Sequence, residues 1–142
     1  MKKTNSTRKD SNDNGEEQEH LMDKEYQLSE AIEAALDTKA QDPVVIELGD
    51  ICSFTDYFFI CTGTSSRHSQ SIADAIEERL KQDGLRPLHI EGHSEGEWIL
   101  LDYFDFVVHI FSARAREFYD LERLWRTGKR RDAQELVTQR TV

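Results

Sequence analysis

The chain has 142 residues, enough for one domain, and 28 Asp and Glu against 18 Lys and Arg give it a formal charge of −10. Phosphate backbones attract Lys and Arg, so this charge argues against nucleic acid as the primary partner and is compatible with a basic protein partner. Only 37% of the residues are hydrophobic, which is low for a fully globular chain of this size and predicts that part of the chain lies outside the core.

The polar N-terminus accounts for much of this low value. Residues 1–22 hold few apolar side chains, so we predict a disordered tail that cannot bury enough surface to offset its ordering entropy. The tail has neither the apolar stretch of a secretory signal nor the acid-poor composition of a transit peptide. The longest later apolar run is interrupted by Asp102, Asp105 and His109, too soon to span a bilayer. We expect a cytoplasmic protein without a membrane contact.

The first half of the chain predicts one helix and two strands. Apolar residues recur at helical spacing from about residue 23 to 40, where Asp42-Pro43 ends the pattern. Residues 44–48 read as a short strand and Gly49-Asp50 as a turn. Residues 57–61 form an unbroken apolar run, typical of a strand that is buried on both faces. We therefore place this strand in the middle of a sheet.

The second half predicts two more helices and three more strands. The hydroxyls of residues 62–66 are suited to cap a helix that ends near Gly84. Strands follow at residues 88–90, 98–102 and 106–111, the last two forming a hairpin, and then a helix at residues 115–125 with Leu121, Leu124 and Trp125 inward. We predict an α/β fold in which a single domain, residues 23–126, has a mixed five-stranded sheet flanked by helices. Residues 127–142 are predicted to be a polar tail.

The hairpin divides into a core side and an accessible side. Strand side chains alternate between faces, so Ile99, Leu101 and Tyr103 share one face and Trp98, Leu100 and Asp102 the other. The aliphatic residues 99 and 101 are the better core candidates, although a one-residue slip in register would reverse the assignment. Residues 102–105 then form a loop with aromatic side chains at its tip.

Several motifs in a fixed order carry a family resemblance. They are residues 55–65 (TDYFFICTGTS), 67–68 (RH), 72–74 (IAD), 91–92 (EG), 97–103 (EWILLDY) and 116–122 (REFYDLE). In this order they resemble the ribosomal silencing factor family, RsfS or Iojap, over about residues 28–126.

The resemblance implies a non-enzymatic protein with an α/β fold related to nucleotidyltransferases. Proteins of this family bind ribosomal protein number fourteen of the large subunit and hinder joining of the small subunit when nutrients are short. Carried over residue by residue, the implied contact residues are Trp98, Leu100, Asp102, Tyr103 and Asp105, with Glu117, Phe118 and Tyr119 adjoining. Phe104 belongs to the same set but stands where the family usually has glycine. Since glycine would permit a positive φ, Phe104 implies a different turn or an extra apolar contact.

Two other functions stay open. A metal-dependent nucleotidyltransferase needs a phosphate-holding turn, which residues 63–66 resemble, and two or three converging carboxylates, of which residues 88–91 offer one. Hairpin loops use aspartates such as Asp102 and Asp105 mainly for turn hydrogen bonds. A self-associating module, with a homodimer formed through the hairpin or its flanking helix, is the other alternative.

The histidines do not form a strong metal motif. His89 and His93 are too few for a zinc site, and His109 on its apolar strand is predicted to be a hydrogen-bonded core histidine. We therefore expect no catalytic residue, no cofactor and no metal.

Overall fold

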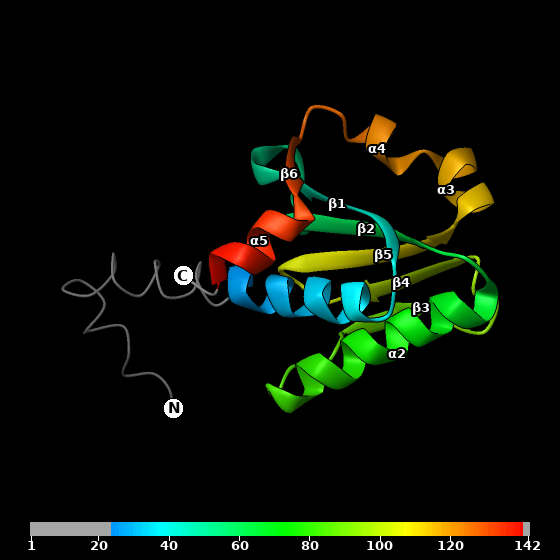
Figure 1. Cartoon of the computed structure of the whole chain (residues 1–142). Coiled ribbons are helices and arrows are strands. Elements are labelled where there is room, and N and C mark those ends of the chain that lie inside the picture. Colours follow the sequence, from blue (N-terminus) through cyan, green and yellow to red (C-terminus); the bar gives the residue numbers. More distant parts are fainter. Residues whose placement is uncertain (1–23, 141–142) are drawn as a thin grey trace.

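The computed structural model describes residues 24–140, which contain one mixed sheet of six strands (Figure 1). The strands are β1 (Gln41–Glu47), β2 (Tyr57–Gly63), β3 (His89–Glu91), β4 (Trp98–Asp102), β5 (Phe106–Ser112) and β6 (Lys129–Asp132). They lie in the order β3-β4-β5-β2-β1-β6. Strands β2 and β5 are parallel, and the other neighbouring pairs are antiparallel. This architecture confirms the predicted mixed α/β fold.

The predicted number of five strands is wrong, because the segment expected to be a C-terminal tail contains β6 and a helix. Strand β6 pairs with β1, and α5 (Ala133–Arg140) follows and buries Leu136 and Val137 in the core. An edge strand of sequence KRRD has no apolar alternation, so periodicity could not reveal it. The predicted N-terminal tail, residues 1–22, lies outside the described residues.

Helices cover one face of the sheet. The N-terminal helix, helical over residues 24–37, packs there together with α2 (Ser66–Gln82) and α5, and Figure 1 shows them on one side of the strands. The hydroxyl of Ser65 accepts the amide proton of His68 at 3.0 Å, which confirms the predicted cap of α2. Strand β2 is buried along its whole length between β1 and β5, as predicted. Within residues 24–140, no helix has the length and apolar character needed to cross a membrane.

The opposite face is covered only in part, by η2 (Gly49–Ile51), α3 (Ala113–Tyr119) and α4 (Leu121–Leu124). The single helix predicted over residues 115–125 is wrong, because Asp120 adopts a left-handed conformation with φ of 48° and separates α3 from α4. Aspartate tolerates this conformation better than most residues. As a result Leu121 is buried and Trp125 is half-buried, whereas Leu124 is exposed and not inward as expected.

Candidate partner-binding face

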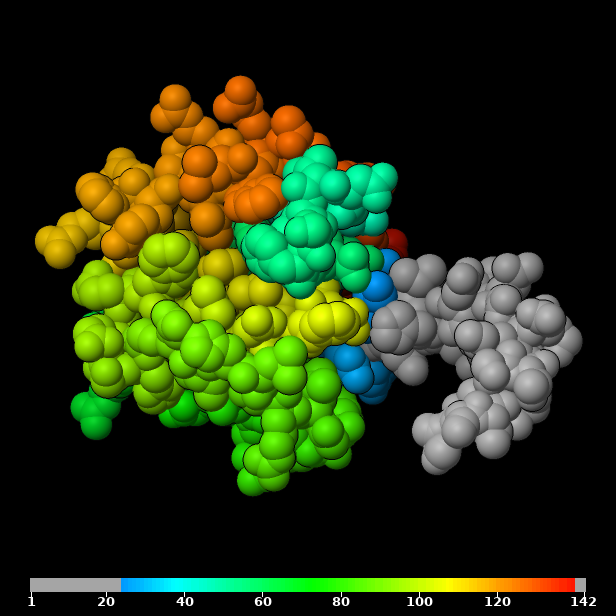
Figure 2. Space-filling model, turned by 180° about the vertical axis from the view of Figure 1, so that it is seen from behind, coloured from blue at the N-terminus to red at the C-terminus, as the bar shows by residue number. Residues whose placement is uncertain are grey.

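Strand β4 presents two large apolar side chains on the partly covered face. Ile99 and Leu101 are fully buried on the helix side, whereas Trp98 and Leu100 are half-buried on the other side, which confirms the predicted alternation. Figure 2 shows β4, the hairpin turn, η2 and the α3–α4 segment meeting on this side of the molecule. This part of the sheet therefore offers an apolar surface with little covering structure.

Several aromatic rings hold the indole of Trp98 in place. Its centroid lies 4.9 Å from that of Phe111 and 4.6 Å from that of Tyr119. The indole N–H donates to Nδ1 of His109 at 3.1 Å. A ring fixed before binding loses little further freedom in a complex, which favours its use as an anchor.

His109 is the buried acceptor that orients this ring. It packs edge-on against Phe58, with centroids 4.6 Å apart, and burial lowers its pKa from 6.5 to about 3. The imidazole is therefore neutral, and because Nδ1 accepts the indole proton, the ring proton resides on Nε2. This arrangement confirms the predicted hydrogen-bonded core histidine.

Two hollows lie near Trp98, one lined by Trp98 itself and the other by Tyr119, which contacts its indole. One of about 440 Å³ is lined by Glu97, Arg114, Ala115, Phe118 and Tyr119. Another of about 170 Å³ is lined by Glu91, Gly92, Trp98 and Leu100. Concave apolar sites beside a fixed aromatic ring can accept side chains of a protein partner.

The hairpin turn displays Phe104, whose side chain is 64% exposed. Its φ is +73°, the left-handed conformation that glycine adopts without strain, so of the two expected consequences a different turn is not observed and the extra apolar contact stays a prediction. Asp102 accepts the amide proton of Phe104 at 2.9 Å, and the Thr55 hydroxyl donates to the Phe104 carbonyl at 2.9 Å. The hydrogen bond of Asp102 is of the kind predicted for aspartate in a turn. Asp105, half-buried, lies next in the same turn.

Tyr103 lies in the core and not on the contact surface that the family resemblance implied. Only 4% of the residue is exposed, and its ring stacks on Phe106 with centroids 5.2 Å apart. Burial, together with the charge of Glu77, raises its pKa. Strand alternation, which put Tyr103 on the side of Ile99 and Leu101, was the correct signal, and the contact role carried over from the family was the misleading one.

Helix α3 carries three predicted residues, of which Tyr119 contacts Trp98 directly. The Tyr119 ring packs against the indole at an angle of 46°, and Phe118, which is 78% exposed, packs edge-on against Tyr119 with centroids 5.0 Å apart. Glu117 is exposed on the same short helix. The structure thus brings residues from β4 and α3 together, although 21 positions separate Trp98 from Tyr119 in the chain.

Arg116 anchors this helix and was not among the predicted site residues. Its guanidinium donates to Glu122 at 2.7 Å, to the carbonyl of Asp42 at 2.7 Å and to the hydroxyl of Thr62 at 2.9 Å. The hydrogen bond from Arg116 lowers the pKa of Glu122. A separation of six residues matches no helical pair, so the sequence did not indicate this contact.

The residues that the sequence suggested for metal or phosphate binding do not come together in one site. The two histidines lie in separate ion pairs, and Gly63 serves the packing of β2 on α2. His89 bonds to Glu91 at 2.6 Å, whereas His93 bonds to Asp74 of α2 at 2.9 Å. In the described part of the chain, no three His, Cys, Asp or Glu side chains are grouped so that they could hold a metal ion. A Cβ added to Gly63 would lie 2.9 Å from the Ser69 amide nitrogen, so this glycine allows β2 to approach α2 closely.

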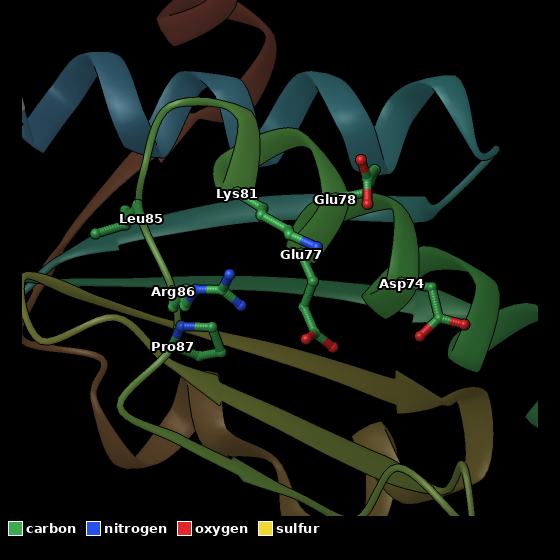
Figure 3. Close-up of a pocket in the computed structure, with 7 residues that line it drawn as sticks. All are labelled: Asp74, Glu77, Glu78, Lys81, Leu85, Arg86 and Pro87. Atoms are coloured by element: carbon green, nitrogen blue, oxygen red, sulfur yellow. The ribbon is translucent and has the colours of Figure 1, made fainter.

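A separate hollow of about 260 Å³ lies on the helix-covered side (Figure 3). Its lining residues are Asp74, Glu77, Glu78, Lys81, Leu85, Arg86 and Pro87. Burial and the neighbouring Asp74 raise the pKa of Glu77. Carboxylates and cations line this hollow together, on the opposite face of the sheet from Trp98.

Comparison with known proteins shows which family the chain resembles in sequence. Residues 21–142 match the family model described as ribosomal silencing factor during starvation, RsfS. The chain belongs to this family. The RsfS of Bacillus subtilis (strain 168) is 36% identical over 104 residues, which cover 73% of this chain and 88% of the relative.

Solved structures agree with the family assignment. A crystal structure from Chromobacterium violaceum is 35% identical, with a TM-score of 0.66, and the match covers 68% of this chain and 80% of that chain. One from Bacillus halodurans is also 35% identical, with a TM-score of 0.63, and the match covers 70% and 91%. These likenesses confirm the RsfS resemblance and the mixed α/β fold. The relation to nucleotidyltransferases stays a prediction.

Proposed function

We propose that this RsfS-family chain binds the large ribosomal subunit and blocks its joining to the small subunit. The contact is with ribosomal protein number fourteen, a basic protein, and the outcome is repression of translation in the cytoplasm under nutrient limitation. The name of the relatives, ribosomal silencing factor, supports a ribosomal target. The observation that carries the proposal is the exposed aromatic surface around Trp98.

We call this surface the aromatic face. It consists of Trp98, Leu100, Phe104, Phe118 and Tyr119, bordered by the carboxylates of Asp102, Asp105 and Glu117. Aromatic side chains are the usual anchors of protein interfaces, and carboxylates around them match a basic partner. Tyr103 is left out of this face because its side chain is buried.

Inhibition by such a protein requires no chemical step. A folded domain of about 110 residues has a radius of gyration of roughly 13 Å. A body of that size on the joining face of one subunit keeps the other from making contact. The protein then acts stoichiometrically, and its effect depends on affinity and abundance. We infer that no catalytic residue is needed.

The test is subunit joining with purified ribosomal subunits, followed by sedimentation. Truncating a central anchor, as in Trp98→Ala, should weaken binding by about 30-fold to 1,000-fold, equivalent to about 2–4 kcal/mol. Because Trp98 also packs on Phe111, Phe118→Ala serves as a second variant at an exposed ring. Leu88→Ala is the matched control, since Leu88 is an exposed apolar residue outside the aromatic face.

The results separate the possible roles of the aromatic face. If Trp98→Ala and Phe118→Ala both bind and block like the unmodified protein, the proposed surface is wrong. If the unmodified protein does not bind large subunits, the proposed function is wrong. A dimer that forms across a concentration series and is lost in Phe118→Ala would assign the face to a second copy of this chain.

A further inference from the structure

The negative charge of the chain is unevenly distributed. Residues 24–112 contain six Lys and Arg against 17 Asp and Glu, whereas residues 113–131 contain seven against three. The net charge of −10 therefore conceals one positive segment. This segment includes α3, α4 and the turn that leads into β6.

Four exposed cations in this segment form what we call the basic ridge: Arg123, Arg126, Lys129 and Arg130. Within residues 24–140, the only ion pair of these four side chains is a 3.5 Å contact from Arg130 to Glu122. Arg116 already neutralises Glu122 at 2.7 Å. The positive charge of the ridge is therefore largely uncompensated by its described neighbours.

Backbone hydrogen bonds hold the ridge in place. The Gly128 amide donates to the Trp125 carbonyl at 2.9 Å, and the Arg126 amide donates to the Arg123 carbonyl at 3.3 Å. A Cβ added to Gly128 would lie 2.6 Å from a methyl group of Ile46, so glycine lets this turn pack directly on β1. The backbone that carries the four cations is therefore fixed before binding, and the ordering cost of binding falls on their side chains.

Arg123, Arg126 and Arg130 of the ridge lie over the same face of the sheet as the aromatic face, whereas Lys129 is opposite Glu47 at the edge of the sheet. In the register of β1 and β6, Arg130 is opposite Ile46, which belongs to the core cluster beneath α3 and α4. Trp98 packs against that same cluster from β4, four strand positions away in the order of the sheet. At about 4.8 Å per strand, the two sites are separated by roughly 19 Å across the sheet, in addition to an offset along the strands. One large surface can contact both at once.

We propose that the basic ridge binds the phosphate backbone of RNA next to the protein contact. The proposal rests on the proposed function, because a basic ribosomal protein lies among the RNA phosphates that it helps to neutralise. Three of the four cations are arginines, whose planar guanidinium matches phosphate in a bidentate geometry. The overall acidity still makes RNA the secondary partner and protein the primary one.

The number of cations sets the size of the effect. Three phosphate contacts, one for each arginine of the ridge, give a slope of about −2.7 in the logarithm of affinity against the logarithm of salt concentration. Raising the salt from 50 to 200 mM should then weaken binding by about 40-fold. Each cation removed should reduce the slope by about one.

The test measures fluorescence anisotropy of a labelled RNA duplex of about 20 base pairs, since roughly 16 base pairs are spanned by proteins that bind such duplexes. The full chain is compared with Arg123→Gln/Arg126→Gln. The matched control is Lys81→Gln/Arg86→Gln, which removes the same charge from exposed positions on the helix-covered side (Figure 3). We expect the ridge variant to lose about two units of slope and at least tenfold in affinity at low salt, with the control unchanged. Equal affinities for the two variants would overturn the proposal.

Two further measurements distinguish RNA from lipid and the ridge from the aromatic face. If vesicles containing phosphatidylserine bind in a ridge-dependent way and the RNA duplex does not, the ridge contacts lipid and the proposal is wrong. Sedimentation with large subunits reports on the function independently. If subunit binding depends on Trp98 while RNA binding is unchanged by the ridge substitutions, only this inference is refuted. RNA binding that depends on the ridge without any subunit binding would refute only the proposed function.

Discussion

Replacing Phe104 by glycine should stabilise the protein although it removes a large apolar side chain. A non-glycine residue in the left-handed region costs roughly 1–2 kcal/mol, and Phe104 has a φ of +73°. Removing this strain would stabilise the folded state, but glycine is more flexible in the unfolded chain, and this flexibility offsets about 0.5–1 kcal/mol of the stabilisation. The exposed ring contributes little to the core. The free energy of unfolding should therefore rise by about 0.5–1 kcal/mol, and the melting temperature by about 3 °C.

Phe104→Ala is the matched control for this substitution. Alanine removes the ring but keeps the Cβ that makes the left-handed conformation unfavourable, so the glycine variant should be more stable than the alanine variant by about 1 kcal/mol. Urea unfolding at equilibrium measures both variants against the unmodified protein. A glycine variant that is less stable than the alanine variant would refute the reasoning about backbone strain. Both should bind large subunits more weakly if the ring contacts the partner.

Three other predictions concern the framework around the site. Arg116→Met should lower the unfolding free energy by about 3 kcal/mol in urea titration, because it leaves Glu122 without its main partner; an unchanged midpoint would contradict the anchoring role. Leu136→Ala should cost about 2–4 kcal/mol, and a loss below about 1 kcal/mol would show that α5 is not part of the core. The lowered pKa of His109, about 3 when folded against 6.5 when unfolded, means that its stability contribution is complete above pH 6.5 and declines as the pH falls toward 3. Lowering the pH from 7 to 5 should reduce the free energy of unfolding by about 2 kcal/mol through this group. The variant His109→Gln should lose this part of the pH dependence, and a pH dependence equal to that of the unmodified protein would refute the prediction.

Local patterns were sufficient for most of the fold. The apolar run at residues 57–61 predicted a central strand because a strand covered on both faces needs apolar side chains along its whole length. The hydroxyls after it predicted the cap of α2, since a helix start needs an acceptor for its free amides. Strand alternation likewise placed Trp98 on one face and Ile99 on the other.

Errors arose where the deciding contacts are distant in the chain. The break at Asp120 is not marked by glycine or proline, and it accompanies the contacts of Arg116 with Thr62 and the Asp42 carbonyl. Strand β6 exists because β1 supplies its hydrogen bonds, and its own sequence is polar. Both features depend on tertiary pairing, which periodicity within a short segment does not report.

The sequence alone determined the family, the order of most elements and the two faces of the β4–β5 hairpin, because these depend on motifs and on side-chain alternation within short segments. Only the tertiary structure decided how the site is built. It buried Tyr103, joined Trp98 to His109 and Tyr119, and put the arginines of the basic ridge on the same side as the aromatic face. These arrangements depend on which strands become neighbours and how the helices pack on them, and residues far apart in the chain decide both.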